Sequence, residues 1–188
     1  MKQHHTDSHT LEKKAKKKSS RFRQALVRTV IMLVAAAVAA VLAAGLWMPV
    51  FEIYGRSMSP TLQEGAVVIG MRDRSPAQGE VVAFYVENKI LIKRVIAVGG
   101  DKLDIAQDGT IYVNDQALEE PYISRKHEDV SNILLPYEVP AGEWFVMGDN
   151  RGSSVDSRHT TVGTVKEEQL AGKLVFQIWP MSGFGFVK

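Results

Sequence analysis

The 188-residue sequence contains no cysteine, which excludes disulfides, cysteine nucleophiles and thiolate metal sites. It also lacks a His-Glu-x-x-His run and a glycine-rich phosphate loop, and its aspartates lack the spacing of a calcium-binding loop. The sequence therefore predicts neither a metal ion nor an organic cofactor. Histidine is scarce as well, because only His127 and His159 follow the single long apolar run.

Charge is distributed unevenly along the chain. Residues 1–28 hold nine basic and two acidic residues, a balance of +7, whereas the remainder holds 14 basic and 19 acidic residues, a balance of −5. The basic residues of the remainder are interspersed with acids and form no stripe along the sequence. We therefore expect no nucleic-acid partner.

One uncharged run of 21 residues extends from Val30 to Val50. As a helix it would measure roughly 31 Å, close to a bilayer core of about 30 Å, so it is predicted to be a transmembrane anchor. The basic residues before it predict a cytoplasmic N-terminus. An alternative is a cleaved secretory signal ending near "VLAAG", although the run is longer than the roughly 7–15 apolar residues of such signals.

Under the anchor interpretation the chain has three parts. They are a basic cytoplasmic tail (1–29), a transmembrane anchor (30–50) and an extracytoplasmic domain (51–188). The first 20 residues are polar and contain no aromatic side chain, so we expect them to be disordered.

Residues 51–188 have the pattern of a mainly β, antiparallel domain. Short runs rich in Val, Ile and aromatic residues alternate with Gly, Pro, Asn or Asp, which is typical of strands joined by turns. The predicted strands are 66–70, 80–86, 89–98, 102–106, 110–114, 143–148 and 173–179. The turn at 107–110 predicts a hairpin, and only residues 166–172 indicate a soluble helix.

The predicted strand 89–98 carries a lysine among apolar residues. In a regular strand Leu91, Lys93, Val95 and Ala97 share one face. An ammonium group desolvated on such a face has a lowered pKa and can act as a general base, although a lysine on an edge strand can also extend into water. A serine hydroxyl needs such a base within reach to become a nucleophile.

Two other polar stretches offer partners for this base. "SMSPTL" contains Ser57 and Ser59, but an ordinary Ser/Pro turn would also explain it. "GDNRGSSVDSR" (148–158) concentrates Asp, Arg and Ser, and suits either a solvent-exposed loop or the support of a site. A Ser-His-Asp triad would need one of the two histidines. His159 lies three residues from Asp156, and that proximity in a loop does not define a triad.

With these stretches in order, the chain resembles the bacterial type I signal peptidases, membrane-anchored serine proteases that remove signal peptides from exported preproteins. The matching motifs are "SMSPTL" (57–62), "KRVIAVGGD" (93–101) and "GDNRGSSVDSR" (148–158), at similar spacing behind a single anchor. The resemblance extends to "VFQIWP" (175–180). It implies an antiparallel β-sheet catalytic domain of the signal-peptidase type, preceded by one transmembrane helix, and no cofactor.

The resemblance also implies roles for individual residues. Ser57 matches the family's nucleophile, and its backbone N–H an oxyanion donor, while Lys93 matches the general base. Ser154 matches the residue that helps to orient the lysine amine. Asp156 and Arg158 match residues that support the architecture of the site.

Two positions depart from the commoner family pattern. Gly55 stands where some members carry a serine whose hydroxyl donates to the oxyanion, so a backbone N–H or a water would have to replace that donor. "VGGD" replaces a turn that usually contains proline, which we interpret as a conformational change only. Met58, directly after the nucleophile, is expected near the membrane-facing rim.

The implied substrates are the signal peptides of preproteins, with small residues at positions −1 and −3, cleaved at the lipid bilayer near the secretion translocon. The apolar stretch "WPMSGFGF" (179–186) either contacts lipid or completes the core. Two alternatives differ in class. A self-cleaving repressor-type Ser-Lys protease should carry a DNA-binding domain and no anchor. A catalytically inert exported β-domain would have a binding or envelope-structural role.

Overall fold

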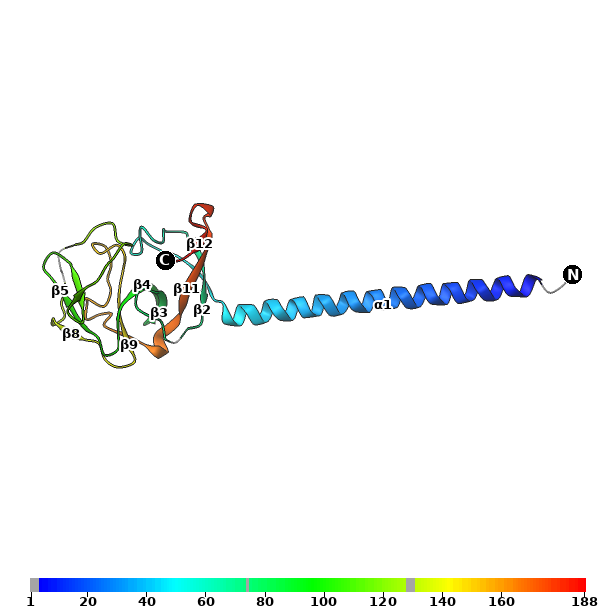
Figure 1. Cartoon of the computed structure of the whole chain (residues 1–188), viewed down its shortest axis with the longest axis horizontal. Helices are drawn as coiled ribbons and strands as arrows, with labels where there is room; N and C mark the ends of the chain where they lie inside the picture. The colour runs from blue at the N-terminus through cyan, green and yellow to red at the C-terminus, as the bar shows by residue number, and fades with distance from the viewer. Residues whose placement is uncertain (1–3, 74, 128–130) are drawn as a thin grey trace. The chain divides into compact units, whose positions relative to one another are not determined.

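The computed structural model describes residues 4–73, 75–127 and 131–188, without the side chains of residues 4–22, 44 and 46 (Figure 1). The chain divides into two compact units, Met1–Leu46 and Trp47–Lys188.

The first unit is one long helix, α1 (His4–Trp47). Its segment Arg23–Ala43 has a mean hydropathy of 2.5 with no part buried, so it is long and apolar enough to cross a membrane. The prediction of a disordered tail is wrong, because the helix begins at His4. The tail holds six lysines and one each of Leu, Glu and Ala, all of which favour helix, and its helix is continuous with the apolar segment.

The helix ends before Val50, the predicted limit of the anchor. Pro49 has no N–H to donate and disfavours helical geometry at Met48, so α1 ends at Trp47 and Val50 already belongs to a strand. The Pro49 carbonyl accepts a hydrogen bond from the Gly70 N–H at 2.7 Å. The residues that follow the helix are therefore part of the second unit.

The second unit consists of two antiparallel sheets, which confirms the predicted fold class. An eight-stranded sheet has the order β1-β2-β11-β3-β4-β9-β10, with β12 paired to β11, and a four-stranded sheet has the order β7-β6-β5-β8. The strands are β1 (Val50–Glu52), β2 (Val67–Met71), β3 (Val81–Val86), β4 (Lys89–Val98), β5 (Lys102–Ile105), β6 (Ile111–Val113), β7 (Gln116–Ala117), β8 (Tyr137–Glu138), β9 (Glu143–Met147), β10 (Val165–Lys166), β11 (Leu170–Trp179) and β12 (Gly185–Phe186). Two 3₁₀ turns, η1 (Glu167–Gln169) and η2 (Met181–Gly183), flank β11.

All seven predicted strands are present, and β5 and β6 form the predicted hairpin. The five strands that were not predicted (β1, β7, β8, β10 and β12) have only two or three residues each, too few to show an alternating pattern. The predicted helix at 166–172 is wrong. Leu170 pairs with Phe84 and Gly172 with Ala83 of β3, which leaves only the turn η1 between two strands.

Strand β4 pairs with its two neighbours over different lengths. It pairs with β3 from Lys89 to Arg94 and with β9 from Arg94 to Val98. A bulge between Val95 and Ala97 shifts the alternation, so Val98 rather than Ala97 lies in the core cluster of Val95. In the described part of the chain, residues 89–93 therefore have no strand partner on the β9 side.

A buried cluster fixes the segment that follows β1. Met58 and Leu62, each 1% exposed, lie in one core cluster with Phe51 and Ile53. The expectation that Met58 lies at a membrane-facing rim is therefore wrong, because its side chain belongs to the core. The burial of these residues holds the turn between them in place.

Candidate active site

Ser57 lies in a tight turn that is anchored on both sides. The Ser59 N–H donates to the Arg56 carbonyl at 3.1 Å, and the Leu62 N–H donates to the Met58 carbonyl at 2.9 Å. The Asn150 N–H donates to the Ser57 carbonyl at 2.9 Å. The backbone of Ser57 is thus held by its own turn and by the 148–158 loop, while its side chain stays partly exposed.

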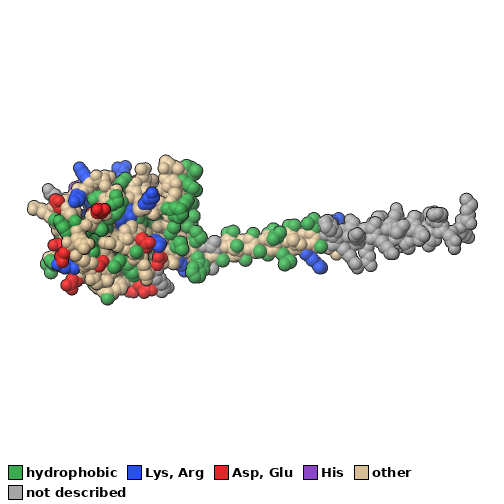
Figure 2. All heavy atoms as spheres, viewed as in Figure 1, with side chains coloured by type: hydrophobic (Ala, Val, Ile, Leu, Met, Phe, Trp, Pro, Cys, Tyr) green, Lys and Arg blue, Asp and Glu red, His purple; other side chains and the backbone are tan. Residues whose placement is uncertain are grey.

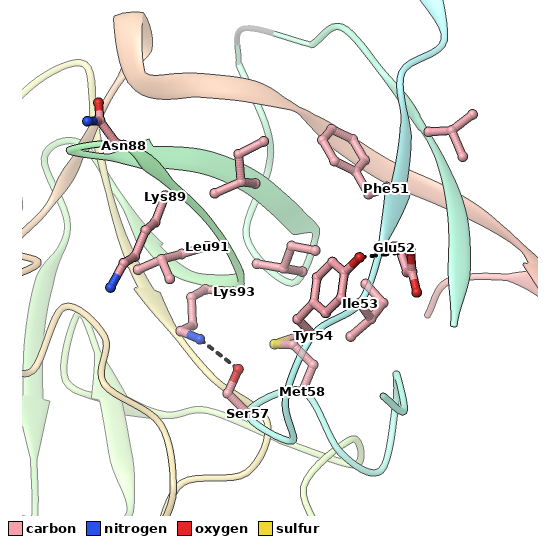
Figure 3. Close-up of a pocket in the computed structure, with 13 residues that line it drawn as sticks. Phe51, Glu52, Ile53, Tyr54, Ser57, Met58, Asn88, Lys89, Leu91 and Lys93 are labelled. Atoms are coloured by element: carbon pink, nitrogen blue, oxygen red, sulfur yellow. Dashed lines mark hydrogen bonds between the residues drawn. The ribbon is translucent and has the colours of Figure 1, made fainter. Parts of the chain in front are cut away.

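Lys93 meets this serine from β4. Its Nζ lies 2.8 Å from the Ser57 Oγ and donates a hydrogen bond to it, as Figure 3 shows. Lys93 is 3% exposed, and its strand partner is the buried Val82. The structure thus brings together two residues that are 36 positions apart in the sequence.

The surroundings of Lys93 favour its neutral form. Burial lowers the pKa of the Lys93 amine to about 8, and the negative charges of Asp156 and Asp149 offset only part of this effect. An amine with this pKa is unprotonated in about a tenth of molecules at pH 7 and in about half at pH 8, and the neutral form can accept a proton from a hydroxyl.

Asp156 and Arg158 form a buried ion pair within the 148–158 loop. The Arg158 Nε donates to Asp156 Oδ1 at 2.8 Å, and the Gly148 N–H donates to Asp156 Oδ2 at 3.0 Å. Burial by itself would raise the pKa of Asp156, but the Arg158 guanidinium and the backbone donor hold it below its usual value. The pair contacts neither Ser57 nor Lys93 directly, so its effect on them is to fix the loop and to supply charge.

Ser154 is buried next to Gly148. Its hydroxyl forms no hydrogen bond with the Lys93 amine, so the expected contact is not formed in this conformation. The hydroxyl instead helps to hold the pKa of the Asp156 carboxyl below its usual value. A Cβ atom added at Gly148 would lie 2.3 Å from the Ser154 Oγ and 2.6 Å from the Ser57 carbonyl oxygen. Only glycine at position 148 therefore lets the loop approach the serine turn this closely.

This close approach predicts a large effect of Gly148→Ala. The added methyl group must displace the Ser57 backbone or the Ser154 side chain, and a shift of about 1 Å at a reacting group can cost on the order of 100-fold in rate. We expect kcat/KM for peptide cleavage to fall by about this factor while the circular dichroism spectrum is unchanged.

Gly45→Ala is the matched control for this substitution, because nothing lies within 4 Å of a Cβ atom at that position. It should cleave at the wild-type rate. Equal kcat/KM for Gly148→Ala and Gly45→Ala would show that the contact between the loop and the serine turn does not matter for activity.

Gly55 has a backbone conformation that favours glycine. Its φ is +82°, and nothing lies within 4 Å of a Cβ atom built there. The missing hydroxyl donor therefore coincides with a left-handed backbone in which any side chain would be strained. Among the described residues, the Ser57 N–H donates to no acceptor, so it is available to a ligand.

A second buried ion pair lies on the other face of β4, and the sequence analysis did not find it. Arg94 donates to both carboxylate oxygens of Asp149 at 2.8 and 2.6 Å, and to the Gly79 carbonyl at 2.7 Å. Its guanidinium lies 4.0 Å from the centre of the Tyr122 ring. The available signal was a second cation directly after Lys93 in an apolar strand. This pair connects β4 to the start of the 148–158 loop.

The two histidines do not form a catalytic triad in the described part of the chain. His159 Nδ1 has no hydrogen-bond partner there, and His127 lines a polar cavity with Ser59 without a hydrogen bond between them. Among the described residues, no group of three His, Cys, Asp or Glu side chains is placed to hold a metal ion.

An apolar groove leads away from Ser57. It has a volume of about 620 Å³ and runs between the β1 segment and the part of β4 that lacks a second strand partner (Figure 3). Its lining includes Phe51, Ile53, Met58, Leu91 and Ile92. Four successive antiparallel pairings connect β1 to β4, so the two strands that border the groove run in the same direction.

Comparisons with known proteins agree on one family. A family model described as "Signal peptidase, peptidase S26" matches residues 24–179. Signal peptidase IB of Staphylococcus aureus (strain MRSA252) is 36% identical over 156 residues, which cover 72% of this chain and 80% of that protein. Signal peptidase I of Bacillus caldolyticus is 35% identical over 152 residues, which cover 72% and 82%.

Among solved structures, a signal peptidase I from Enterococcus faecalis V583 is 29% identical, with a TM-score of 0.43. The match covers 52% of this chain and 95% of that one.

Proposed function

Because the chain belongs to the signal peptidase family, peptidase S26, and is a serine endopeptidase that cleaves signal peptides, we propose that Ser57 and Lys93 are its catalytic pair. The observation that carries this assignment is the 2.8 Å hydrogen bond between the Lys93 Nζ and the Ser57 Oγ, made by an amine that is almost fully buried. Nothing in the structure or among the relatives favours an inert β-domain.

The proposed reaction needs only these groups and a water molecule. Neutral Lys93 accepts the Ser57 hydroxyl proton while Oγ attacks the scissile carbonyl carbon, and the Ser57 N–H donates to the resulting oxyanion. The Lys93 ammonium then gives this proton to the leaving amine, and the peptide bond breaks. Lys93 next takes a proton from a water that attacks the acyl-enzyme, and gives this proton to the Ser57 Oγ as the ester bond breaks. Gly55 supplies no side-chain donor to the oxyanion, so a second donor would be a backbone N–H or a water.

The remaining site residues have supporting roles in this proposal. Asp156 and Arg158 keep the 148–158 loop against the serine turn. Ser154 carries a buried hydroxyl next to Gly148 and close to the Ser57 carbonyl. Its burial at this place supports a role in orienting the Lys93 amine.

The apolar groove is suited to an extended peptide. Each border strand has an edge without a strand partner among the described residues, so a signal peptide would bind there by β-augmentation. In an extended chain the side chains at −1 and −3 point to the same side, here toward the apolar lining. Walls made of Ile53, Met58 and Ile92 would admit small side chains and exclude large ones.

The size of the residue at −1 tests this binding mode. A preprotein peptide with Ala at −1 should be cleaved by the full-length enzyme in detergent. Its Phe variant should show a kcat/KM lower by roughly 100-fold, because a large side chain overpacks a site shaped for a methyl group. The matched control replaces Ala by Phe far from the scissile bond on the mature side. Equal rates for the −1 pair would argue against the groove as the binding site.

The apolar helix and the family indicate a membrane-anchored enzyme. We propose that residues 1–29 form a cytoplasmic tail, that the segment predicted at 30–50 serves as the anchor, and that residues 51–188 lie outside the membrane. The nine basic residues before the anchor support this orientation. Tethering near the translocon would raise the effective concentration of the bilayer-bound signal peptide.

The apolar C-terminal stretch supports contact with the lipid bilayer. Trp179, Met181, Phe184 and Phe186 are 56–72% exposed, so they do not complete the core. Figure 2 shows hydrophobic side chains gathered over the part of the second unit that contains β2 and β12. Exposed aromatic side chains of this kind favour a membrane interface.

A further inference from the structure

The surroundings of Ser57 are of two kinds. One is the apolar groove between β1 and β4. The turn that carries Ser57 also borders two smaller polar cavities, which share Ser59 in their lining. The first has a volume of about 260 Å³ and is lined by Arg56, Ser59, Gln63 and Glu64.

The second polar cavity also has a volume of about 260 Å³, and Asn150 and Arg125 contribute to its lining. Asn150 is bonded to the serine turn twice, through its N–H to the Ser57 carbonyl at 2.9 Å and through its Nδ2 to the Arg56 carbonyl at 3.2 Å. Residues that line the polar cavities are therefore hydrogen-bonded to the turn that carries the nucleophile.

Arg56 is the charged residue closest to the nucleophile in sequence. Its backbone carbonyl is fixed by the Asn150 and Ser59 donors, whereas its side chain is exposed and forms no ion pair within the described part of the chain. The position of its Cα is thus fixed, while the guanidinium remains available to a ligand beside Ser57. An exposed arginine in this state recognises carboxylates through paired N–H donors.

This inference rests on the proposed function. If the signal-peptide side of the substrate fills the apolar groove, the chain that follows the scissile bond continues past Ser57, where the serine turn presents Arg56 and is bonded to Asn150. We propose that Arg56 is a specificity-determining residue that favours preproteins with an acidic side chain among the first three residues of the mature protein.

The other charged groups around this exit route are largely paired. Asp149 is neutralised by Arg94, and Arg151 forms a buried ion pair with Glu120. Glu64 lines the same cavity as Arg56, and its negative charge opposes the binding of an acidic substrate side chain. Arg125 lines the neighbouring cavity, and its positive charge favours the binding of an acidic substrate side chain.

Three sets of three peptides test the proposal, and the peptides of one set differ only at one mature-side position. They share Ala at −1 and −3 and carry Asp, Asn or Lys at +1, +2 or +3 in turn, and kcat/KM is measured with the full-length enzyme in detergent at low ionic strength. For at least one position we expect Asp to exceed Asn by roughly two- to fivefold, the range of an exposed charge pair, and Lys to fall below Asn. The preference should shrink when salt is added.

Substitutions then assign the preference to one side chain. Arg56→Gln should abolish the Asp/Asn ratio and leave cleavage of the Asn peptide within about twofold of wild type, because the backbone contacts of residue 56 are kept. Glu64→Gln should increase the ratio. Lys102→Gln makes the same charge change on the four-stranded sheet, and should leave the ratio as in wild type.

The outcomes separate this proposal from the proposed function. An unchanged Asp/Asn ratio in Arg56→Gln, with normal cleavage of the Asn peptide, overturns the role of Arg56 and leaves the catalytic pair intact. Loss of the ratio in Lys102→Gln as well would reduce the effect to overall charge. No cleavage of any peptide by the wild-type enzyme would contradict the proposed function itself.

Discussion

Ser57→Ala is expected to lower kcat/KM for preprotein cleavage by about 10⁴-fold or more. Removal of a serine nucleophile eliminates the acyl-enzyme route, and the activity that remains comes only from binding and oxyanion donors. The substitution deletes one partly exposed hydroxyl and its hydrogen bond to Lys93, so the protein should stay folded. The measurement is cleavage of a preprotein by the purified enzyme, with circular dichroism as the check on folding.

Ser59→Ala is the matched control, because it removes a hydroxyl two residues away in the same turn. Ser59 has no side-chain hydrogen bond to Lys93, so this variant should keep substantial activity. Loss of all activity in Ser59→Ala together with an active Ser57→Ala would reverse the choice of nucleophile.

Lys93→Met should be inactivating to a comparable degree. Methionine matches the apolar length of lysine but cannot accept the Ser57 proton, so the hydroxyl would remain a weak nucleophile. The variant should also be at least as stable as wild type. The folded-state pKa of Lys93 is about 8 rather than 10.5, so below pH 8 the folded protein carries a desolvated ammonium at a cost of order 3 kcal/mol, which methionine removes.

The same pKa predicts the pH dependence of the wild-type enzyme. Only neutral Lys93 can act as the base, so kcat/KM should rise about tenfold per unit of pH at acidic pH and level off near pH 8. The free energy of unfolding should also rise with pH, because protonation of Lys93 is linked to unfolding. The unfolded state binds more protons than the folded state between about pH 8 and 10.5, so the contribution of Lys93 to stability increases as pH rises through this window.

Thermal unfolding of wild type and Lys93→Met across pH checks the predicted stability effect. Measurement of kcat/KM across the same pH range checks the predicted rate profile. The difference in their unfolding temperatures should be largest below pH 8 and should shrink toward pH 10.5. A difference that does not depend on pH, or a rate profile that levels off below pH 6, would contradict a buried lysine base.

Local patterns in the sequence were sufficient for the long elements of the fold. Runs of five to ten residues such as those at 81–86 and 89–98 alternate or are continuously apolar, and a 21-residue uncharged run needs no partner to be identified as an apolar helix. The two-residue strands have no such signal, because they exist only through pairing with a neighbour. The helix predicted at 166–172 is wrong for the same reason, since the pairing of Leu170 and Gly172 with β3 overrides local preference.

The composition of the site was also visible in the sequence, but only through a resemblance. The motifs around Ser57, Lys93 and Asp156 identified which side chains belong together without showing any distance between them. The alternation of the strand placed Ala97 on the same face as Val95, which is wrong. A bulge between these two residues shifts the alternation, and this bulge depends on the register with β9. The Arg94–Asp149 pair was not found, because two charges 55 residues apart in the sequence carry no pairing signal.

The sequence by itself determined the family, the apolar helix, the long strands and the identities of the proposed nucleophile and base, since each of these depends on residue types at short range or on motif order. Only the tertiary structure decided that Lys93 is buried and 2.8 Å from Ser57, that Gly148 allows the loop to approach, and that an apolar groove and a polar cavity both border the serine turn. The physical reason is that desolvation and close approach depend on atoms contributed by distant strands, which come together only when the sheet forms.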